Sequence, residues 1–266
     1  MSAVLQASNE PVLLRHDAGG IATVTLNRPK QYNALSEELL IELQSALDSI
    51  EKDPLVRVVV IAGSGSAFCA GHDLKQMRAT PKKAYYEQLF ARCSRIMLTL
   101  TRMPQPVIAR VHGIATAAGC QLVAQCDLAV ASDNARFAVS GINVALFCST
   151  PSVALARNVS RKNAMEMLLT GDFIDAANAK ARGLVNRVVA IENLDAEVKA
   201  LADAIIAKSS VAVTTGKRMF YKQIEMGMDA AYEYASEVMA CNMMAEDVGE
   251  GIDAFAQKRT PNWKGK

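Results

Sequence analysis

Two loops built from small residues follow two apolar stretches of the chain, and their backbones could do chemistry. Residues 63–75 follow the β-branched run 56–62, and residues 113–119 follow the apolar run 106–111. Small side chains let another molecule approach the backbone, and the first N–H groups of a helix have no internal partner. One such donor from each loop could bind a single oxygen, as a carbonyl that becomes negatively charged requires. The alternative is a pair of tight turns that only save space.

Alternating strand and helix patterns must position these loops. Short apolar runs predict strands at residues 12–15, 21–26, 56–62, 106–111, 127–131 and 184–189. Helices are expected after Ser36, over residues 83–102, and from the second loop to Cys126. Ser160 and Asp175 could cap two further helices. This alternation predicts an α/β core.

The chain changes character near residue 195. From Glu192 onward it shows helical patterns and no strand pattern, so we expect a core over residues 1–195 and a helical region over 196–266. The chain has 266 residues, of which 51% are hydrophobic, and can therefore bury a substantial core. Its formal net charge of +2 points to neither nucleic acid nor an acidic membrane surface as a partner.

Cysteine usage and the N-terminal residues predict a cytoplasmic protein. The six cysteines form no CxxC pair, which favours free thiols in a reducing compartment over disulfides or zinc ligands. The first residues, MSAVLQASNEPVLL, lack a basic segment followed by an apolar one, so no signal peptide is expected. Residues 137–156 carry no charge, but Asn143, Pro151 and several serines indicate protein-buried chain and not a membrane span.

Several spaced motifs resemble the crotonase superfamily of enoyl-CoA hydratases and isomerases. They are NRPKQYNALS, GSAFCAGHDLKQM, PVIARVHGIATAAGCQLVAQCDLAVAS, AMEMLLTGDFIDAANAKARGLVNRVV and EGIDAFAQKRTPNW. Within the superfamily, the chain resembles the branch called enoyl-CoA hydratase domain-containing protein 3 in its segments FCSTPSVALAR, GHDL and AAGCQLVA. The resemblance implies an acyl-CoA ligand and a core of repeated ββα units. It also implies a C-terminal helical region that forms a trimer, often within a dimer of trimers.

By this resemblance, the backbone N–H groups of His72 and Ala118 form an oxyanion hole. A thioester carbonyl gains negative charge when its α-carbon is deprotonated or its β-carbon is attacked, and two fixed donors stabilise that enolate. The family usually has a small residue where His72 stands. Its imidazole is either a spectator that points to the CoA channel, which we favour, or an additional acid or base.

The resemblance also assigns contacts with the coenzyme. A loop and a pocket that touch adenine and pantetheine in the family correspond here to Lys30, Tyr32, Ala34, Ala70, Leu74 and Lys75. Phe255 and Lys258 match C-terminal residues that cover the pocket and meet the phosphate, sometimes from a neighbouring subunit. Without the family match, each lysine would be interpreted as a solvated surface charge. No cofactor beyond the CoA moiety of the substrate, and no metal, is expected.

Two positions depart from the family pattern where hydration needs acid–base groups. The family holds and activates a water between two glutamates, and the corresponding residues here are Gln121 and Gly141. An amide cannot take a proton at neutral pH, and glycine has no functional group. Some relatives use an aspartate eight residues beyond the second position, where this chain has Ser149. We therefore expect little or no standard hydratase activity.

The remaining reactive side chains of this part of the chain are better explained as structural. Asp127 lies at a helix-to-strand junction, and Asp133 lies in a turn signal. Cys148 has no evident histidine partner, which favours a buried thiol over a nucleophile.

These observations predict an acyl-CoA protein that stabilises a thioester enolate without a strong carboxylate base. Decarboxylation or slow thioester cleavage fits that description. The alternative is a non-catalytic acyl-CoA binder or assembly subunit, because binding uses the same two donors. An RNA-binding role is the weakest hypothesis, since residues 82–83 are only a pair of lysines and no basic stripe with interleaved aromatics occurs.

Overall fold

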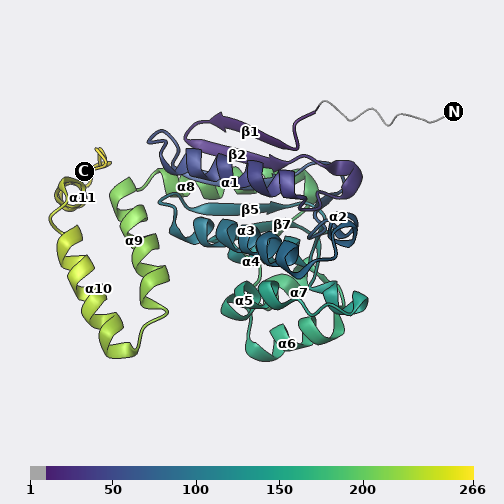
Figure 1. Cartoon of the computed structure of the whole chain (residues 1–266). Coiled ribbons are helices and arrows are strands. Elements are labelled where there is room, and N and C mark those ends of the chain that lie inside the picture. Colours follow the sequence, from purple (N-terminus) through teal and green to yellow (C-terminus); the bar gives the residue numbers. More distant parts are fainter. Residues whose placement is uncertain (1–9) are drawn as a thin grey trace.

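The computed structural model describes residues 10–266, whose strands form two sheets (Figure 1). The larger sheet has the order β1-β2-β3-β5-β7-β10, and the smaller has the order β4-β6-β8-β9. The strands of the larger sheet are Leu13–Ala18, Ile21–Leu26, Val58–Gly63, Val107–Val111, Leu128–Ser132 and Arg187–Val189. Those of the smaller sheet are Ala67–Cys69, Ile114–Thr116, Arg136–Ala138 and Ile174–Asp175.

The expectation of no signal peptide rests partly on residues 1–9, which lie outside the described residues.

Alternate residues of the central strand β3 face two helical layers. Val59 and Ile61 pack in the main core, which also contains α1 (Glu37–Glu51), α3 (Lys83–Arg102) and α4 (Ala118–Gln125). Val58 and Val60 pack against α8 (Leu194–Ile206) on the other side. Both faces of the parallel strands are thus covered, which explains the uninterrupted apolar run in the sequence. The expected boundary after residue 195 falls inside α8, and its packing against the sheet associates this helix with the core.

Capping residues explain where several helices begin. The Ser36 hydroxyl accepts a hydrogen bond from the Leu39 N–H at 3.2 Å, at the start of α1. The apolar face expected for this helix is buried and consists of Leu39, Leu40, Leu43, Leu47 and Ile50. Asp175 caps α7 (Ala176–Ala181) through the Asn178 N–H at 2.8 Å. Ser160 precedes α6 (Arg161–Thr170) but makes no side-chain capping bond.

The smaller sheet was not predicted. Its strands contain only two or three residues, too few to show an alternation of polar and apolar side chains. Residues 63–75 and 113–119, expected to be loops, contain β4 and β6, which pair in parallel. Two helices were also missed, α2 (Leu74–Ala79) and α5 (Ser149–Asn158). No helix of residues 10–266 is long and apolar enough to cross a membrane.

The C-terminal helices extend away from the sheets (Figure 1). They are α9 (Ser210–Gln223), α10 (Met228–Asn242) and α11 (Glu246–Ala256), in agreement with the helical pattern expected after Glu192. No residue of α9 or α10 is buried as a whole, although the Lys217 side chain of α9 is. Their exposed large apolar side chains are Phe220, Met228, Tyr232 and Met239, and Ile224 directly after α9 is exposed as well. Apolar surface of this extent is typical of an interaction face.

A buried ion pair ties α9 to the core. The Lys217 ammonium lies 2.7 Å from the Asp127 carboxylate and also donates to the Leu100 and Gln105 carbonyls at 2.7 and 2.8 Å. The Tyr221 hydroxyl donates to the same carboxylate at 2.8 Å. Asp127 is therefore fully engaged in joining α9 to the end of α4, which supports the structural role expected for it.

Candidate active site

The two small-residue segments meet because their short strands pair. β4 and β6 are joined in parallel register, with Ala67 opposite Ile114 and Cys69 opposite Ala115. The chain leaves β4 through Gly71, whose φ is +88°, a conformation that glycine adopts without strain. A Cβ on Gly71 would lie 3.1 Å from the Ala118 nitrogen and 2.9 Å from the Ala117 Cβ. Only a glycine lets the His72 segment approach the start of α4 this closely.

The backbone N–H groups of His72 and Ala118 are free to bind a ligand. Among residues 10–266, neither donates to a backbone or side-chain acceptor. The residues beside His72 are held in place, since the Leu35 N–H donates to the Gly71 carbonyl at 2.7 Å. Ala118 is the first residue of α4, so its N–H has no intrahelical partner. The structure therefore brings together the two residues that the sequence predicted as the oxyanion hole.

Ala117 has a strained backbone directly before this helix. Its φ of 50° and ψ of −120° lie in a region that residues with a Cβ rarely adopt. Such a conformation costs on the order of 1–3 kcal/mol and persists where surrounding contacts impose it. Here the Ala117 N–H donates to the Ala138 carbonyl of β8 at 3.0 Å. The smaller sheet thus fixes the direction in which α4 begins, and with it the direction of the Ala118 N–H.

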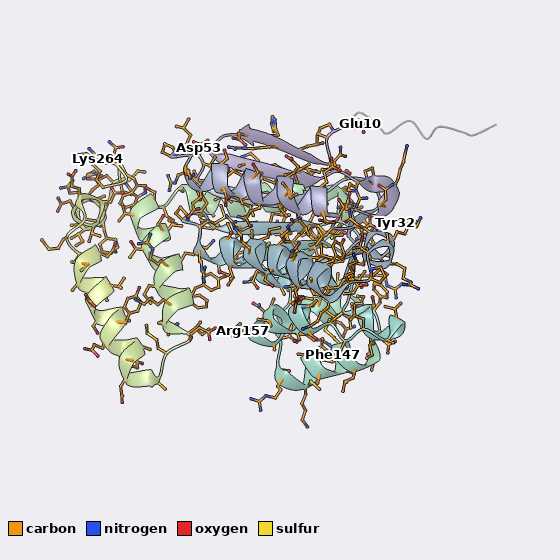
Figure 2. The ribbon with its side chains drawn as sticks, in the orientation of Figure 1. Glu10, Tyr32, Asp53, Phe147, Arg157 and Lys264 are labelled. Carbon is orange, nitrogen blue, oxygen red and sulfur yellow. The ribbon has the colours of Figure 1, made fainter. Side chains whose placement is uncertain are left out.

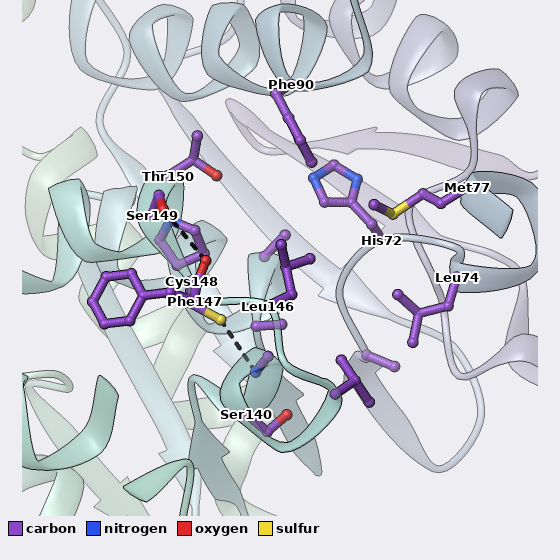
Figure 3. A pocket seen from close by; sticks show the side chains of 16 residues that line it. His72, Leu74, Met77, Phe90, Ser140, Leu146, Phe147, Cys148, Ser149 and Thr150 are labelled. Atoms are coloured by element: carbon purple, nitrogen blue, oxygen red, sulfur yellow. Dashed lines mark hydrogen bonds between the residues drawn. The ribbon is translucent and has the colours of Figure 1, made fainter. Parts of the chain in front are cut away.

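A cavity of about 200 Å³ adjoins both donors (Figure 3). His72 and Ala118 line one side, and the segment from Ser140 to Pro151 lines the opposite side. Met77 and Phe90 add apolar surface from α2 and α3. No aspartate or glutamate of residues 10–266 lines this cavity. The site offers backbone donors and apolar walls, but no carboxylate.

The His72 imidazole lies in the cavity wall and does not point to the surface (Figure 3). Its ring meets Phe90 edge-on, with 5.5 Å between the ring centroids. Neither ring nitrogen has a hydrogen-bond partner among residues 10–266, although both are buried. Burial lowers the pKa of His72 to about 4. The ring is therefore neutral at pH 7, which leaves one N–H donor and one acceptor nitrogen.

The opposite side of the cavity has no room for an acidic side chain at residue 141. The Gly141 N–H donates to the Cys148 sulfur at 3.3 Å. A Cβ on Gly141 would overlap the Leu146 carbonyl oxygen and lie 2.7 Å from the Cys148 sulfur. The glycine is therefore required by the tight packing of this segment. Burial raises the pKa of Cys148, which keeps it a thiol.

The other predicted catalytic position, Gln121, is buried in α4 and is not among the residues that line the cavity. Its side-chain oxygen has no hydrogen-bond partner within residues 10–266. Ser149 does line the cavity, at the start of α5. Asp133 is exposed in a turn, as expected.

Two of the predicted coenzyme contacts line the cavity, and a third is joined to one of them by a backbone hydrogen bond. The Ala70 N–H donates to the Tyr32 carbonyl at 3.0 Å, and both Ala70 and Leu74 line the cavity. Lys30, Tyr32 and Lys75 are exposed, whereas Ala34 is buried.

Phe255 and Lys258 are not brought to the cavity of the same chain. Phe255 is 86% exposed. It lies in α11, at the end of the molecule opposite α2 (Figure 1). Figure 2 likewise shows Tyr32 and the C-terminal Lys264 at opposite ends. The structure of one chain therefore does not bring these two predicted coenzyme contacts together with the others.

Comparisons with known proteins agree with this geometry. A family model described as enoyl-CoA hydratase/isomerase matches residues 16–266. The Xenopus laevis protein named enoyl-CoA hydratase domain-containing protein 3, mitochondrial, is 46% identical over 253 residues, which cover 95% of this chain and 86% of that protein. The human protein of the same name is 46% identical over 246 residues, covering 92% and 80% of the two chains.

Solved structures show the same fold. A crystal structure of an enoyl-CoA hydratase from Mycobacterium smegmatis matches with a TM-score of 0.94 and 60% identity, covering 96% of this chain and 99% of that one. The crystal structure of human enoyl-CoA hydratase domain-containing protein 3 matches with a TM-score of 0.92 and 44% identity, covering 95% and 100%. The resemblance to this branch, inferred from three short segments, is thereby confirmed.

The predicted cytoplasmic location is wrong in light of these relatives. Five relatives that are 41–46% identical to this chain carry the word mitochondrial in their names. Cysteine usage could not distinguish these compartments, because free thiols are compatible with any reducing environment. The matched residues, the shared fold and the paired donors lead to one conclusion: the chain belongs to the enoyl-CoA hydratase/isomerase family, the crotonase superfamily.

Proposed function

We propose that this protein binds acyl-CoA thioesters and stabilises a thioester enolate through the backbone N–H groups of His72 and Ala118. The observation that carries the proposal is that both donors are free and border one apolar cavity. Two preorganised donors favour the enolate over the neutral thioester, and one such donor is worth about 3 kcal/mol of barrier. An apolar wall suits an acyl chain.

We further propose that ordinary hydration of enoyl-CoA is absent or very slow. Hydration needs a group that activates water, and no carboxylate of residues 10–266 lines the cavity. An acidic side chain at residue 141 would not fit without movement of this segment, because its Cβ would overlap the Leu146 carbonyl oxygen. Enolate chemistry that needs no strong carboxylate base, such as decarboxylation, remains compatible with this site.

The coenzyme would enter past Ala70 and Leu74, with Lys30, Tyr32 and Lys75 at the surface for its polar parts. Lysines of this kind can act as point charges for phosphate. Phe255 and Lys258 would complete the site of a neighbouring subunit. We propose a homotrimer, alone or as a dimer of trimers, in which the exposed apolar side chains of α9 and α10 are covered.

A non-catalytic acyl-CoA binder or assembly subunit is the second candidate. The same absence of a carboxylate from the cavity, within residues 10–266, favours it. Binding uses the two backbone donors in the same way, so turnover distinguishes the two functions.

The first test follows the thioester absorbance of crotonyl-CoA, which falls when hydration removes the conjugated double bond. The same sample is titrated with crotonyl-CoA by calorimetry. We expect binding without a fall in absorbance. Hydration at a rate typical of relatives with two glutamates would refute the proposed lack of hydratase activity. Absence of binding by the oligomeric protein would refute acyl-CoA binding itself.

A further inference from the structure

His72 contributes two different groups to the cavity. Its backbone N–H faces the position proposed for the thioester oxygen, and its imidazole forms part of the cavity wall. Both groups belong to one residue, so a thioester held by the N–H would lie in the same cavity whose wall the ring forms.

The surroundings of the ring do not explain why the residue is a histidine. The ring packs edge-on against Phe90, a contact that a phenylalanine side chain could make equally well. Both ring nitrogens are buried, and neither makes a hydrogen bond of good geometry within residues 10–266. The ring does meet the Leu35 backbone, a contact that offsets part of the effect of burial on the pKa of His72. A buried polar atom without a partner lowers stability. An imidazole in this position is costly to the fold, and a ligand is the group that could satisfy it.

Other groups around the cavity are poor candidates for a base. The Cys148 thiol lines the opposite side of the cavity and accepts a hydrogen bond from the Gly141 N–H. The hydroxyls of Ser140, Ser149 and Thr150 do not titrate near neutral pH. Asp73 follows His72 in the chain, but its carboxylate pairs with Arg28 at 3.0 Å and caps α2. Tyr86 stacks against Phe90 behind the ring. Among residues 10–266, His72 is thus the one cavity-lining side chain that can accept a proton at pH 7.

We propose that the His72 imidazole is the catalytic base and acid of this site and moves a proton at the α-carbon of the bound acyl thioester. This proposal rests on the proposed function, since it requires the thioester oxygen to be held by the two backbone donors.

The proton transfer balances within the site. The lone pair of the unprotonated ring nitrogen takes the proton from the α-carbon. The C–H electron pair becomes the carbon–carbon double bond of the enolate, and the carbonyl π pair moves to the oxygen. The imidazolium then returns its proton to the α-carbon, or to the γ-carbon when the substrate is a 3-enoyl thioester. Burial lowers the pKa of His72, so the ring begins in the required neutral form, and the nearby enolate stabilises the imidazolium.

The test measures deuterium uptake at the α-carbon of butyryl-CoA in D2O by mass spectrometry, and the conversion of 3-butenoyl-CoA to crotonyl-CoA by absorbance. The second assay detects a proton that returns without exchanging with solvent. His72→Phe and His72→Ala both keep the backbone N–H while removing the ring nitrogens. His16→Ala, on the exposed strand β1, is the matched control outside the cavity.

We expect both variants at His72 to lose activity in these assays by roughly 10²–10⁴-fold, with the Kd for butyryl-CoA changed only a few-fold. His16→Ala should match wild type. Added imidazole should raise the rate of His72→Ala at least tenfold. It should not raise the rate of His72→Phe, because the phenyl ring occupies the position that imidazole would take. In wild type, kcat/KM should fall as the pH decreases through the pKa of His72, because protonation removes the base.

Each outcome separates this inference from the proposed function. Wild-type protein that binds butyryl-CoA but shows activity in neither assay would overturn the role of His72 and leave acyl-CoA binding intact. Full activity in folded His72→Phe would do the same. Failure of wild type to bind butyryl-CoA would instead refute the proposed function. Circular dichroism identifies a variant that does not fold. Because phenylalanine and alanine differ in size, the second variant provides the test if the first does not fold.

Discussion

The two sides of the cavity differ in the kind of group that they present. The side formed by β4, β6 and the start of α4 presents backbone N–H groups, and glycines with no space for a Cβ hold it together. The side formed by residues 140–151 presents side chains from a short helical turn and the start of α5. By family resemblance, the two backbone donors of the first side are retained, whereas Gly141 on the second side corresponds to a glutamate position.

On the proposed function, this difference separates the groups that bind the thioester oxygen from the groups that would transfer protons. Backbone donors depend on strand pairing and close packing, so changing them disrupts the fold around them. Side chains on a cavity wall can be replaced while the pairing of β4 with β6 remains intact. The predictions below change one side at a time, from the largest expected effect to the smallest.

The largest effect is expected from Gly119→Ala on the backbone side. A Cβ here would overlap the Cys69 carbonyl oxygen and lie 2.7 Å from its carbonyl carbon, so α4 must move away from β4. Displacement of the Ala118 donor relative to the His72 donor should abolish enolate chemistry, and the overlap should lower the free energy of unfolding by about 3 kcal/mol or more. Deuterium uptake at the α-carbon of butyryl-CoA measures the first effect, and urea denaturation measures the second.

Gly249→Ala in α11 is the matched control for this substitution. No atom lies within 4 Å of the position that its Cβ would occupy, and the residue is exposed. An alanine in a helix is favoured over glycine, so this variant should be slightly stabilised, by up to about 1 kcal/mol. Equal stability of the two variants would contradict the close packing assigned to Gly119.

The next effect concerns how the His72 ring makes stability depend on pH. Burial lowers the pKa of His72 to about 4 in the folded protein, from an ordinary value of 6.5. Between these values the unfolded chain binds a proton that the folded protein does not, so the free energy of unfolding decreases as the pH falls from 6.5 to 4. The loss is on the order of 3 kcal/mol, and it is absent above pH 6.5.

His72→Phe removes this titration. The variant should be at least as stable as wild type at pH 7, because it buries no unpaired nitrogen. Its advantage over wild type should grow as the pH is lowered to 4, as measured by urea denaturation at several pH values. Parallel stability curves for the two proteins would show that the ring is protonated as easily in the folded protein as in the unfolded chain.

The smallest of the three effects is expected from Gly141→Glu on the side-chain side. This substitution introduces the glutamate that the family has at this position, but we expect no hydratase activity. The new Cβ would displace Leu146 or Cys148 and so distort the segment that must hold the glutamate in place. Overpacking of this kind costs about 1–3 kcal/mol. The crotonyl-CoA absorbance assay and a thermal melt of the same sample measure the outcome. Appearance of hydratase activity in this single variant would show that the segment can open to accept a carboxylate.

Several elements could be predicted from the sequence because their signals are local. The helix after Ser36 has both a capping residue and an apolar stripe, and it begins where expected. The strand run 56–62 is recognisable because both of its faces are buried. The smaller sheet could not be predicted, since strands of two or three residues carry no pattern of their own. Its pairing partners lie far apart in the chain, and only folding brings them together.

The sequence by itself determined the family, the strand–helix alternation and the two residues whose N–H groups form the candidate oxyanion hole, because these depend on residue types at fixed spacing. The tertiary structure alone decided which way the side chains point and which positions have room. It placed the His72 ring in the wall of the cavity that Ala70 and Leu74 also line. It also placed Phe255 far from the cavity of its own chain. Orientation and free space are set by packing between segments distant in sequence, and no local pattern records them.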